Sequence, residues 1–302
     1  MAVDAPQTPT SKHEPFSNLG VPRVVRFSDL LGDLADDAIA AYAAAQSGVP
    51  RGPITGLPRL DRILGGALVP GLHMLHAPPG VGKSALALQI ASQGTYPSLL
   101  ISAEMSPLEL LRRTIARVEG TFLGRLKSGE LHPKEIIAKA RGVAASVPLL
   151  AIADTTRHPA PRSWIEANAI LAFAGHPTGL LVVDSLHSWA DAFDAHMDEY
   201  TRLAAALKAL RAIASTLACP ILVVAERNRA SMKSGGLNAG AGHRGIEFGA
   251  ETVMGLDADD DDSHPIATGE SKITLMIAKN RNGSCGKVSL MFNGARQMWR
   301  EA

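Results

Sequence analysis

The chain has 302 residues, of which 46% are apolar, and a formal net charge of +1. This length and composition suit one large α/β domain with an extension, and they exclude a protein coated in basic residues, so any nucleic-acid contact has to be local. The two cysteines, Cys219 and Cys285, form neither a metal-ligand spacing nor a disulfide framework. Without a signal peptide or a membrane-length apolar run, we expect a soluble, cytoplasmic chain with no membrane partner.

The N-terminal part is expected to stand outside the main domain. Residues 1–27 are rich in Pro, Ser, Thr and charge, which predicts a disordered tail. Residues 28–53 are predicted to hold a helix over 29–45, capped by Ser28 and ended by Gly48, followed by a Gly/Pro linker. This helix packs either on its own domain or on a neighbouring subunit, because periodicity reveals a buried face but not its partner.

From residue 54 onward, short apolar runs alternate with helical stretches, as in βαβ units with a mostly parallel sheet. The expected strands cover 72–76, 98–102, 149–153, 180–184 and 221–225. The expected helices cover 84–92, 107–117, 133–145, 162–173 and 200–217. The last part of the chain is expected to form antiparallel strands joined by turns, over 252–256, 272–278, 287–292 and 297–300.

A Gly/Pro-rich loop, HAPPGVGKS at residues 76–84, lies between the first of these strands and the first of these helices. A strand, a tight loop and a helix start predict a phosphate-binding loop, whose N–H groups and helix dipole favour an anion. Lys83 is placed to reach the β- and γ-phosphates, and the Ser84 hydroxyl to ligate Mg²⁺. The alternative is a plain turn before a helix. The candidate nucleotide-binding residues are Ala77, which replaces the usual first glycine, and Pro78, Pro79, Gly80, Val81, Gly82, Lys83, Ser84 and Ala85.

Three acidic residues lie at or just after the ends of expected parallel strands, whose carboxyl ends share one edge of a sheet. Asp184 ends an apolar run and is expected to hold the water shell of Mg²⁺ beside the loop. Glu104 could orient and activate the water that attacks the γ-phosphate, or could simply be stabilised by the dipole of the following helix. Glu226 could sense the γ-phosphate and signal to the next loop.

Two basic segments are candidates for contacts outside the chain. The Gly-rich loop 230–245 carries Lys233 and Arg244 and no acidic residue, so it could touch a phosphate backbone or be an ordinary surface loop. Arg281 lies in the segment 279–283 after an apolar strand. It could reach a neighbouring subunit's γ-phosphate as an arginine finger, or it could be the tip of a basic hairpin.

Together these motifs resemble the C-terminal motor domain of DnaB-type replicative helicases, a RecA-like ATPase family. The phosphate loop alone is unspecific, whereas Ser-Ala-Glu-Met-Ser at 102–106 followed by Lys-Asn-Arg-Asn-Gly at 279–283 is far more specific. The resemblance covers residues 54–301. Its other carriers are Thr55-Gly56-Leu57 with Leu60-Asp61, Ser128-Gly129-Glu130-Leu131, Val182-Val183-Asp184-Ser185-Leu186, Asn228-Arg229 and Gly245-Ile246-Glu247.

The resemblance implies a RecA-like P-loop NTPase fold over 54–302, with a mostly parallel central sheet flanked by helices and C-terminal antiparallel strands. It also implies a homo-oligomeric ring, a hexamer by this resemblance, that binds ATP and Mg²⁺ between subunits. Glu104 matches the family's catalytic glutamate and Asp184 its second Mg²⁺-associated carboxylate. Lys279 and Arg281 match residues that act on the neighbour's ATP. The helix over 29–45 matches a linker helix that clasps the adjacent subunit, which favours docking.

The chain also departs from the family. About fifty residues precede the motor, so the N-terminal helical domain and its coupling to primase are not expected. Glu226 stands where the family usually has Gln, and its charge repels ATP, so hydrolysis or its coupling to DNA is expected to differ. The DNA-loop positions do not match one by one, and Lys233 and Arg244 are candidate single-stranded DNA contacts on charge alone. Arg229, from the Asn228-Arg229 motif, is a third candidate contact.

Three functions remain open on the sequence. The first is an ATP-dependent ring helicase that translocates on single-stranded DNA in replication, with a helicase loader or replication initiator as a candidate partner. The second is a RadA-like or KaiC-like ATPase in recombination or regulation, without processive unwinding. The third is a weakly hydrolysing accessory subunit of another helicase's ring.

Overall fold

The computed structural model describes residues 24–158, 160–191, 193, 196–226, 249–258 and 269–302. The chain divides into two compact units, Met1–Ser47 and Gly48–Ala302, and each is described by itself. The tail predicted over 1–27 falls almost entirely outside the described residues.

The described part of the first unit is a 3₁₀ turn, η1 (Phe27–Leu30), that runs into helix α1 (Leu31–Ser47). The helix ends before Gly48, which has a positive φ of 69°, as its predicted stop requires. The predicted Ser28 cap is wrong. Ser28 lies inside η1, where the Asp29 carboxylate accepts a 3.0 Å hydrogen bond from the Arg26 N–H and starts the first turn earlier. No residue of α1 is buried, so its apolar side chains remain exposed.

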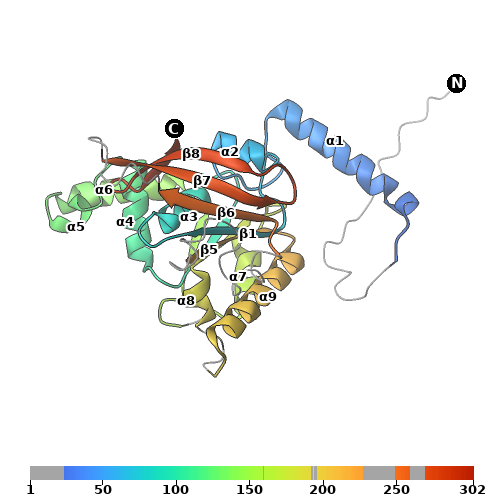
Figure 1. Cartoon of the computed structure of the whole chain (residues 1–302). Helices are drawn as coiled ribbons and strands as arrows, with labels where there is room; N and C mark the ends of the chain where they lie inside the picture. The colour runs from blue at the N-terminus through green and yellow to red at the C-terminus, as the bar shows by residue number, and fades with distance from the viewer. Residues whose placement is uncertain (1–23, 159, 192, 194–195, 227–248, 259–268) are drawn as a thin grey trace. The chain divides into compact units, whose positions relative to one another are not determined.

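The described residues of the second unit form one sheet of nine strands, with helices between the strands along the chain (Figure 1). The strands are β1 (Gly71–Ala77), β2 (Ser98–Ser102), β3 (Leu150–Asp154), β4 (Leu180–Asp184), β5 (Pro220–Glu226), β6 (Thr252–Ala258), β7 (Glu270–Asn280), β8 (Gly286–Asn293) and β9 (Met298–Glu301). The helices are α2 (Pro58–Ile63), α3 (Lys83–Ala91), α4 (Pro107–Val118), α5 (Arg125–Ser128), α6 (Pro133–Ser146), α7 (Arg162–Ala172), α8 (Leu186–Ala190) and α9 (Glu199–Leu217).

The strand order is β3-β2-β4-β5-β1-β6-β7-β8-β9. All pairs from β3 to β6 are parallel, and the pairs β6–β7, β7–β8 and β8–β9 are antiparallel. The expected mostly parallel sheet with C-terminal antiparallel strands is confirmed, with one correction. β6 belongs to both parts, because it lies parallel to β1 on one side and antiparallel to β7 on the other.

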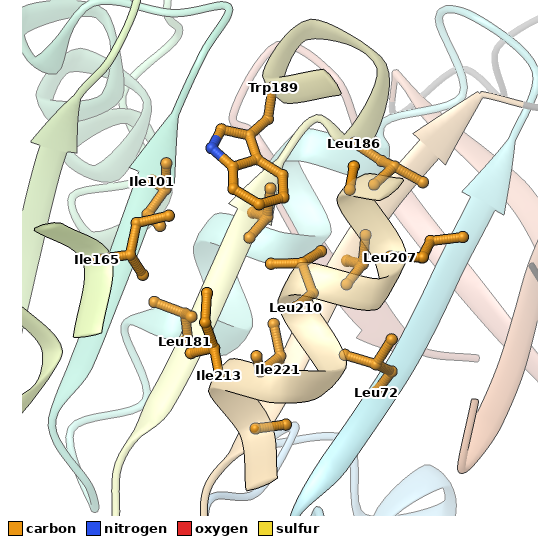
Figure 2. Packing of buried hydrophobic residues seen from close by; sticks show 14 of the residues in the cluster. Leu72, Ile101, Ile165, Leu181, Leu186, Trp189, Leu207, Leu210, Ile213 and Ile221 are labelled. Atoms are coloured by element: carbon orange, nitrogen blue, oxygen red, sulfur yellow. The ribbon is translucent and has the colours of Figure 1, made fainter. Parts of the chain in front are cut away.

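The sheet is buried on both faces because its central strands are apolar throughout rather than alternating. In β4, Leu181 and Val183 point into one core cluster, whereas Leu180 and Val182 point into the other. The first cluster packs against α7, α8 and α9, which lie together on one side of the strands in Figure 1. Figure 2 shows how Leu207, Leu210 and Ile213 of α9 and Trp189 of α8 cover this face. The second cluster contains side chains of α2, α3 and α4.

This arrangement places the carboxyl ends of β1, β2, β4 and β5 along one edge of the sheet, which we call the carboxyl edge. In the parallel register, Ala77 lies opposite Glu226, and Ser102 lies opposite Asp184. Ligands of open α/β sheets bind outside this carboxyl edge. Among the described helices, none combines the length and the apolar character needed to cross a bilayer.

Candidate nucleotide site

The loop between β1 and α3 is shaped by two glycines with positive φ, Gly80 at 84° and Gly82 at 99°. Gly82 also has no room for a side chain, because a Cβ there would lie 2.8 Å from Phe292 Cε1 and 2.9 Å from Trp299 Cζ2. Those two rings are stacked with their centroids 4.5 Å apart. The C-terminal strands β8 and β9 therefore form a platform under the loop.

Helix α3 is tied to the same platform. The Gln89 side chain donates to the Trp299 carbonyl and accepts from the Trp299 N–H, with both bonds 2.9 Å long. This pair fixes the helix relative to β9, and hence the direction in which its N-terminal N–H groups point. Such an N-terminus, preceded by a tight glycine loop, can hold the phosphates of a nucleotide.

Lys83, the first residue of α3, is folded back over the loop. Its Nζ donates to the carbonyl oxygens of Ala77 and Pro78, each 3.0 Å away. Burial lowers the pKa of Lys83, while the negative charges of Glu226, Glu104 and Asp184 oppose that effect. These carboxylates favour the charged form of Lys83, and a cation at this position in the loop can pair with a polyphosphate.

Ser84 and Asp184 lie side by side, as expected. The Ser84 hydroxyl donates to Asp184 Oδ1 over 3.0 Å. Burial raises the pKa of Asp184 to about 6; the hydrogen bond from Ser84 opposes the rise and the charge of Glu104 adds to it. One hydroxyl and one carboxylate fit Mg²⁺, which takes few protein ligands and completes its shell with phosphate oxygens and water. Among the described residues, no three acidic, His or Cys side chains cluster as a protein-only metal site.

Glu104 lies next to this pair, in the connection between β2 and α4. The backbone N–H of the preceding residue, Ala103, donates to the Asp184 carbonyl over 2.9 Å. The Glu104 Oε1 atom accepts a hydrogen bond from the Ser185 hydroxyl and another, 2.9 Å long, from the Ser188 hydroxyl. The carboxylate is therefore held in one direction by two donors at the start of α8.

Sequence reasoning missed three residues of this site. Ser185 and Ser188 received no role, although Ser185 directly follows Asp184 in the chain. The charge of Arg113 on α4 lowers the pKa of Asp184, and its Nη1 donates to the Gln297 side chain over 2.5 Å. No local pattern marks these residues, because each acts on a partner far away in the chain.

Glu226 is the exposed last residue of β5 and lies beside Ala77 in the register. The structure thus brings Lys83, Ser84, Glu104, Asp184 and Glu226 to one edge of the sheet. Arg229, Lys233 and Arg244 fall outside the described residues.

Arg281 and Lys279 lie at the opposite edge of the sheet, where the parallel strands begin, which we call the amino edge. Their strand β7 runs antiparallel to β6, so its last residue, Asn280, pairs with the first residue of β6, Thr252. The Arg281 side chain forms an ion pair with Glu251, with Nη1 and Oε1 3.2 Å apart. The length of β1 separates this edge from the phosphate loop by about 20 Å at roughly 3.3 Å per residue. An arginine side chain is much shorter, so Arg281 cannot reach the loop of its own chain.

Comparison with known proteins gives a consistent result. The family model for the DnaB-like helicase C-terminal domain matches residues 52–301. A replicative DNA helicase DnaB from Treponema pallidum (strain Nichols) is 29% identical over 303 residues, covering 95% of this chain and 64% of the relative. A replicative DNA helicase DnaB from Geobacillus stearothermophilus is 28% identical over 262 residues, covering 80% of this chain and 55% of the relative. The chain therefore spans less than two thirds of the length of both relatives.

A solved structure described as a DnaB-like replicative helicase and its interactions with primase has the same fold, with a TM-score of 0.73 at 20% identity. The match covers 88% of this chain and 66% of the other. The fold is therefore that of a RecA-like ATPase domain, and the family implies that the edge site binds a nucleotide. With its family match across the whole sheet, the chain belongs to the DnaB-like helicase C-terminal domain family.

Proposed function

We propose that this chain is the motor of an ATP-dependent DNA helicase that unwinds duplex DNA during replication in the cytoplasm. It works as a homo-oligomeric ring, in our proposal a hexamer, with ATP and Mg²⁺ bound between subunits. One observation carries the proposal: the nucleotide-site residues and Arg281 lie at opposite edges of one sheet. Each chain can therefore contribute its phosphate loop to one nucleotide site and its Arg281 to a second site, as a ring of identical subunits requires.

The chemistry at the carboxyl edge follows from the residues there. The loop N–H groups and Lys83 hold the phosphates, and Ser84 with Asp184 holds Mg²⁺. When bound, Mg²⁺ neutralises charge on the phosphate oxygens. Glu104 orients the attacking water and accepts its proton, with its direction set by the two serine hydroxyls.

The amino edge of the next subunit completes the site in this proposal. Arg281 and Lys279 bring positive charge to the γ-phosphate from outside, where charge accumulates in the transition state. Hydrolysis then depends on how neighbouring subunits meet, which couples turnover to motion around the ring. Helix α1, with its exposed apolar side chains, is the segment we propose to dock on the adjacent subunit.

The nucleic-acid contacts of the proposal lie in the segment after β5. Arg229, Lys233 and Arg244 are its candidate contacts with the phosphates of single-stranded DNA. Because Glu226 ends β5 beside the nucleotide site, this segment begins where the γ-phosphate is expected. A helicase loader or a replication initiator is the further partner that we propose.

Glu226 favours one second candidate, a weakly hydrolysing subunit that joins another helicase's ring. Its charge adds a third carboxylate near Lys83 and repels the γ-phosphate. Turnover by the isolated chain separates the two functions. A wild-type rate no higher than that of Lys83→Ala and Glu104→Gln favours the accessory subunit.

The proposal is tested with the purified chain, Mg²⁺-ATP and a forked DNA substrate. We expect hydrolysis that single-stranded DNA stimulates, together with strand separation, and neither with Lys83→Ala. A chain that hydrolyses ATP and exchanges strands without unwinding is instead a recombination-type ATPase. A chain that neither hydrolyses nor unwinds contradicts the proposal.

A further inference from the structure

Glu251 links three segments that meet at the amino edge of the sheet. It directly precedes β6, and its N–H donates to the Leu72 carbonyl of β1 over 2.7 Å. Its own carbonyl accepts a 2.9 Å hydrogen bond from the Arg281 N–H, just beyond β7. The backbone of Glu251 therefore sets the position from which the Arg281 side chain leaves the sheet.

The Glu251 side chain reaches the same hairpin a second time. Its Oε1 lies 3.2 Å from Arg281 Nη1, and its Oε2 accepts a 3.5 Å hydrogen bond from Asn282 Nδ2. Both carboxylate oxygens and the main-chain carbonyl thus serve two consecutive residues of the β7–β8 turn. An ordinary surface ion pair makes one contact and contributes little. Glu251 instead contacts the turn through three of its oxygen atoms.

The neighbouring strand leaves room for this side chain. Gly71, the first residue of β1, has a φ of 131°, and a Cβ there would lie only 2.5 Å from Glu251 Cγ. The Glu251 side chain consequently lies across the start of β1, and 21% of it is exposed. On the other side, Asn280 Nδ2 donates to the Ile63 carbonyl over 2.9 Å and fixes the base of the turn.

We propose that Glu251 is a positioning residue that aims Arg281 at the γ-phosphate bound by the neighbouring subunit. The inference rests on the proposed function, in which Arg281 completes that site. The Arg281 side chain is 50% exposed, and an unrestrained arginine samples many rotamers. Holding the guanidinium at its Nη1 atom removes much of that freedom before the subunits meet. Misplacing a catalytic charge by about 1 Å can cost 100-fold in rate.

The test uses the full chain with Glu251→Ala, Glu251→Gln and Arg281→Ala. We expect Glu251→Ala to lower kcat for ATP about tenfold and to leave KM within about twofold, because Glu251 is remote from the phosphate loop of its own chain. Glu251→Gln keeps the shape of the side chain and removes its charge, and we expect it to lower kcat less than Glu251→Ala does. In an Arg281→Ala background, Glu251→Ala is expected to cause no further loss.

A mixing experiment separates positioning from folding. Glu104→Gln protomers cannot turn over ATP in their own site but keep Glu251 and Arg281 intact. Mixed with Glu251→Ala protomers, they are expected to restore turnover at sites completed by a Glu104→Gln neighbour. A mixture of Glu251→Ala with Arg281→Ala has no anchored arginine, and its turnover is expected not to rise above that of Glu251→Ala alone.

A matched control is Glu270→Gln, which removes another ion pair of β7, that of Glu270 with Arg300 at 2.7 Å. It is expected to behave as the wild type. If Arg281→Ala keeps wild-type turnover, the proposed function fails. If Arg281→Ala loses turnover while Glu251→Ala keeps it, the positioning role fails. Loss in Glu251→Ala that Glu104→Gln protomers do not rescue also contradicts the inference, because it indicates a folding defect.

Discussion

The Ser84 hydroxyl donates a 3.0 Å hydrogen bond to the Asp184 carboxylate, although a hundred positions separate the two residues in the chain. Parallel pairing of β4 with β5, and of β5 with β1, brings the carboxyl ends of β4 and β1 to the same edge. Asp184 is the last residue of β4, and Ser84 follows the loop after β1. The bond satisfies one oxygen of a carboxylate that is almost fully buried. The same two side chains are the pair that we expect Mg²⁺ to contact.

The raised pKa of Asp184 predicts a pH-dependent cost in stability. A pKa of about 6 in the folded chain, against 3.8 for the ordinary group, corresponds to about 3 kcal/mol. The folded state binds this proton more tightly, so stability is lost as the pH rises from about 4 through 6. We expect Asp184→Asn to raise the free energy of unfolding above pH 7, measured by urea denaturation without nucleotide, and its advantage to shrink toward pH 4.

The same variant is expected to lose stabilisation by Mg²⁺. Thermal melting with ATP, with and without Mg²⁺, measures this directly. The wild type is expected to melt higher when Mg²⁺ is present, and Asp184→Asn to show little difference. For the pH prediction, a gain in the free energy of unfolding from Asp184→Asn that is the same at every pH would show that burial of the Asp184 charge does not cause the gain.

The phosphate loop gives a matched pair of glycine substitutions. Gly82→Ala meets both a positive φ and the rings of Phe292 and Trp299, so we expect a loss of about 2–4 kcal/mol. Gly80→Ala meets only the positive φ, with no atom within 4 Å of the new Cβ, and is expected to cost about 1–2 kcal/mol. Urea denaturation measures both values, and equal losses would contradict the role given to the aromatic platform.

The serines around Glu104 are expected to act on rate rather than on binding. Glu104→Gln should lower kcat at least about 100-fold and retain ATP binding. Ser188→Ala removes one of the two donors to Oε1, and we expect kcat to fall roughly tenfold with KM nearly unchanged. Steady-state kinetics over a range of pH checks both variants. A change in KM alone would mean that Ser188 shapes the nucleotide site without orienting Glu104.

Glu226→Gln is expected to strengthen ATP binding more than ADP binding. The carboxylate repels a γ-phosphate, and removing about 1 kcal/mol of repulsion corresponds to roughly fivefold in Kd. Titration with a non-hydrolysable ATP analogue and with ADP measures the ratio. An equal change for both nucleotides would place Glu226 away from the γ-phosphate.

Much of the nucleotide site could be predicted from the sequence because each part has a local pattern. A continuous apolar run predicts a buried parallel strand, and a carboxylate at its end marks the edge, as for Asp184 and Glu226. The short helix α8 was not expected, because its five residues are too few to show a helical period. Without α8, the bond from Ser188 to Glu104 could not be foreseen.

Contacts at the amino edge of the sheet could also not be foreseen from the sequence. The Arg281 turn could be recognised from its own residues, whereas its contact with Glu251 depends on the pairing of β6 with β7. The predicted antiparallel character of β6 was half right for a related reason. A strand's pattern records how it is buried, but not which neighbours it has on each side. The domain boundaries and the roles assigned to the site residues remain predictions.

The position of Arg281 in the assembled protein decides whether neighbouring subunits share each nucleotide site. A cryo-EM map of the chain with Mg²⁺, a non-hydrolysable ATP analogue and single-stranded DNA tests this most directly. We predict that the Arg281 guanidinium lies within hydrogen-bond distance of the γ-phosphate held by Lys83 of the adjacent subunit, with Glu251 still behind it. A map in which Arg281 lies far from every bound nucleotide would contradict the shared site.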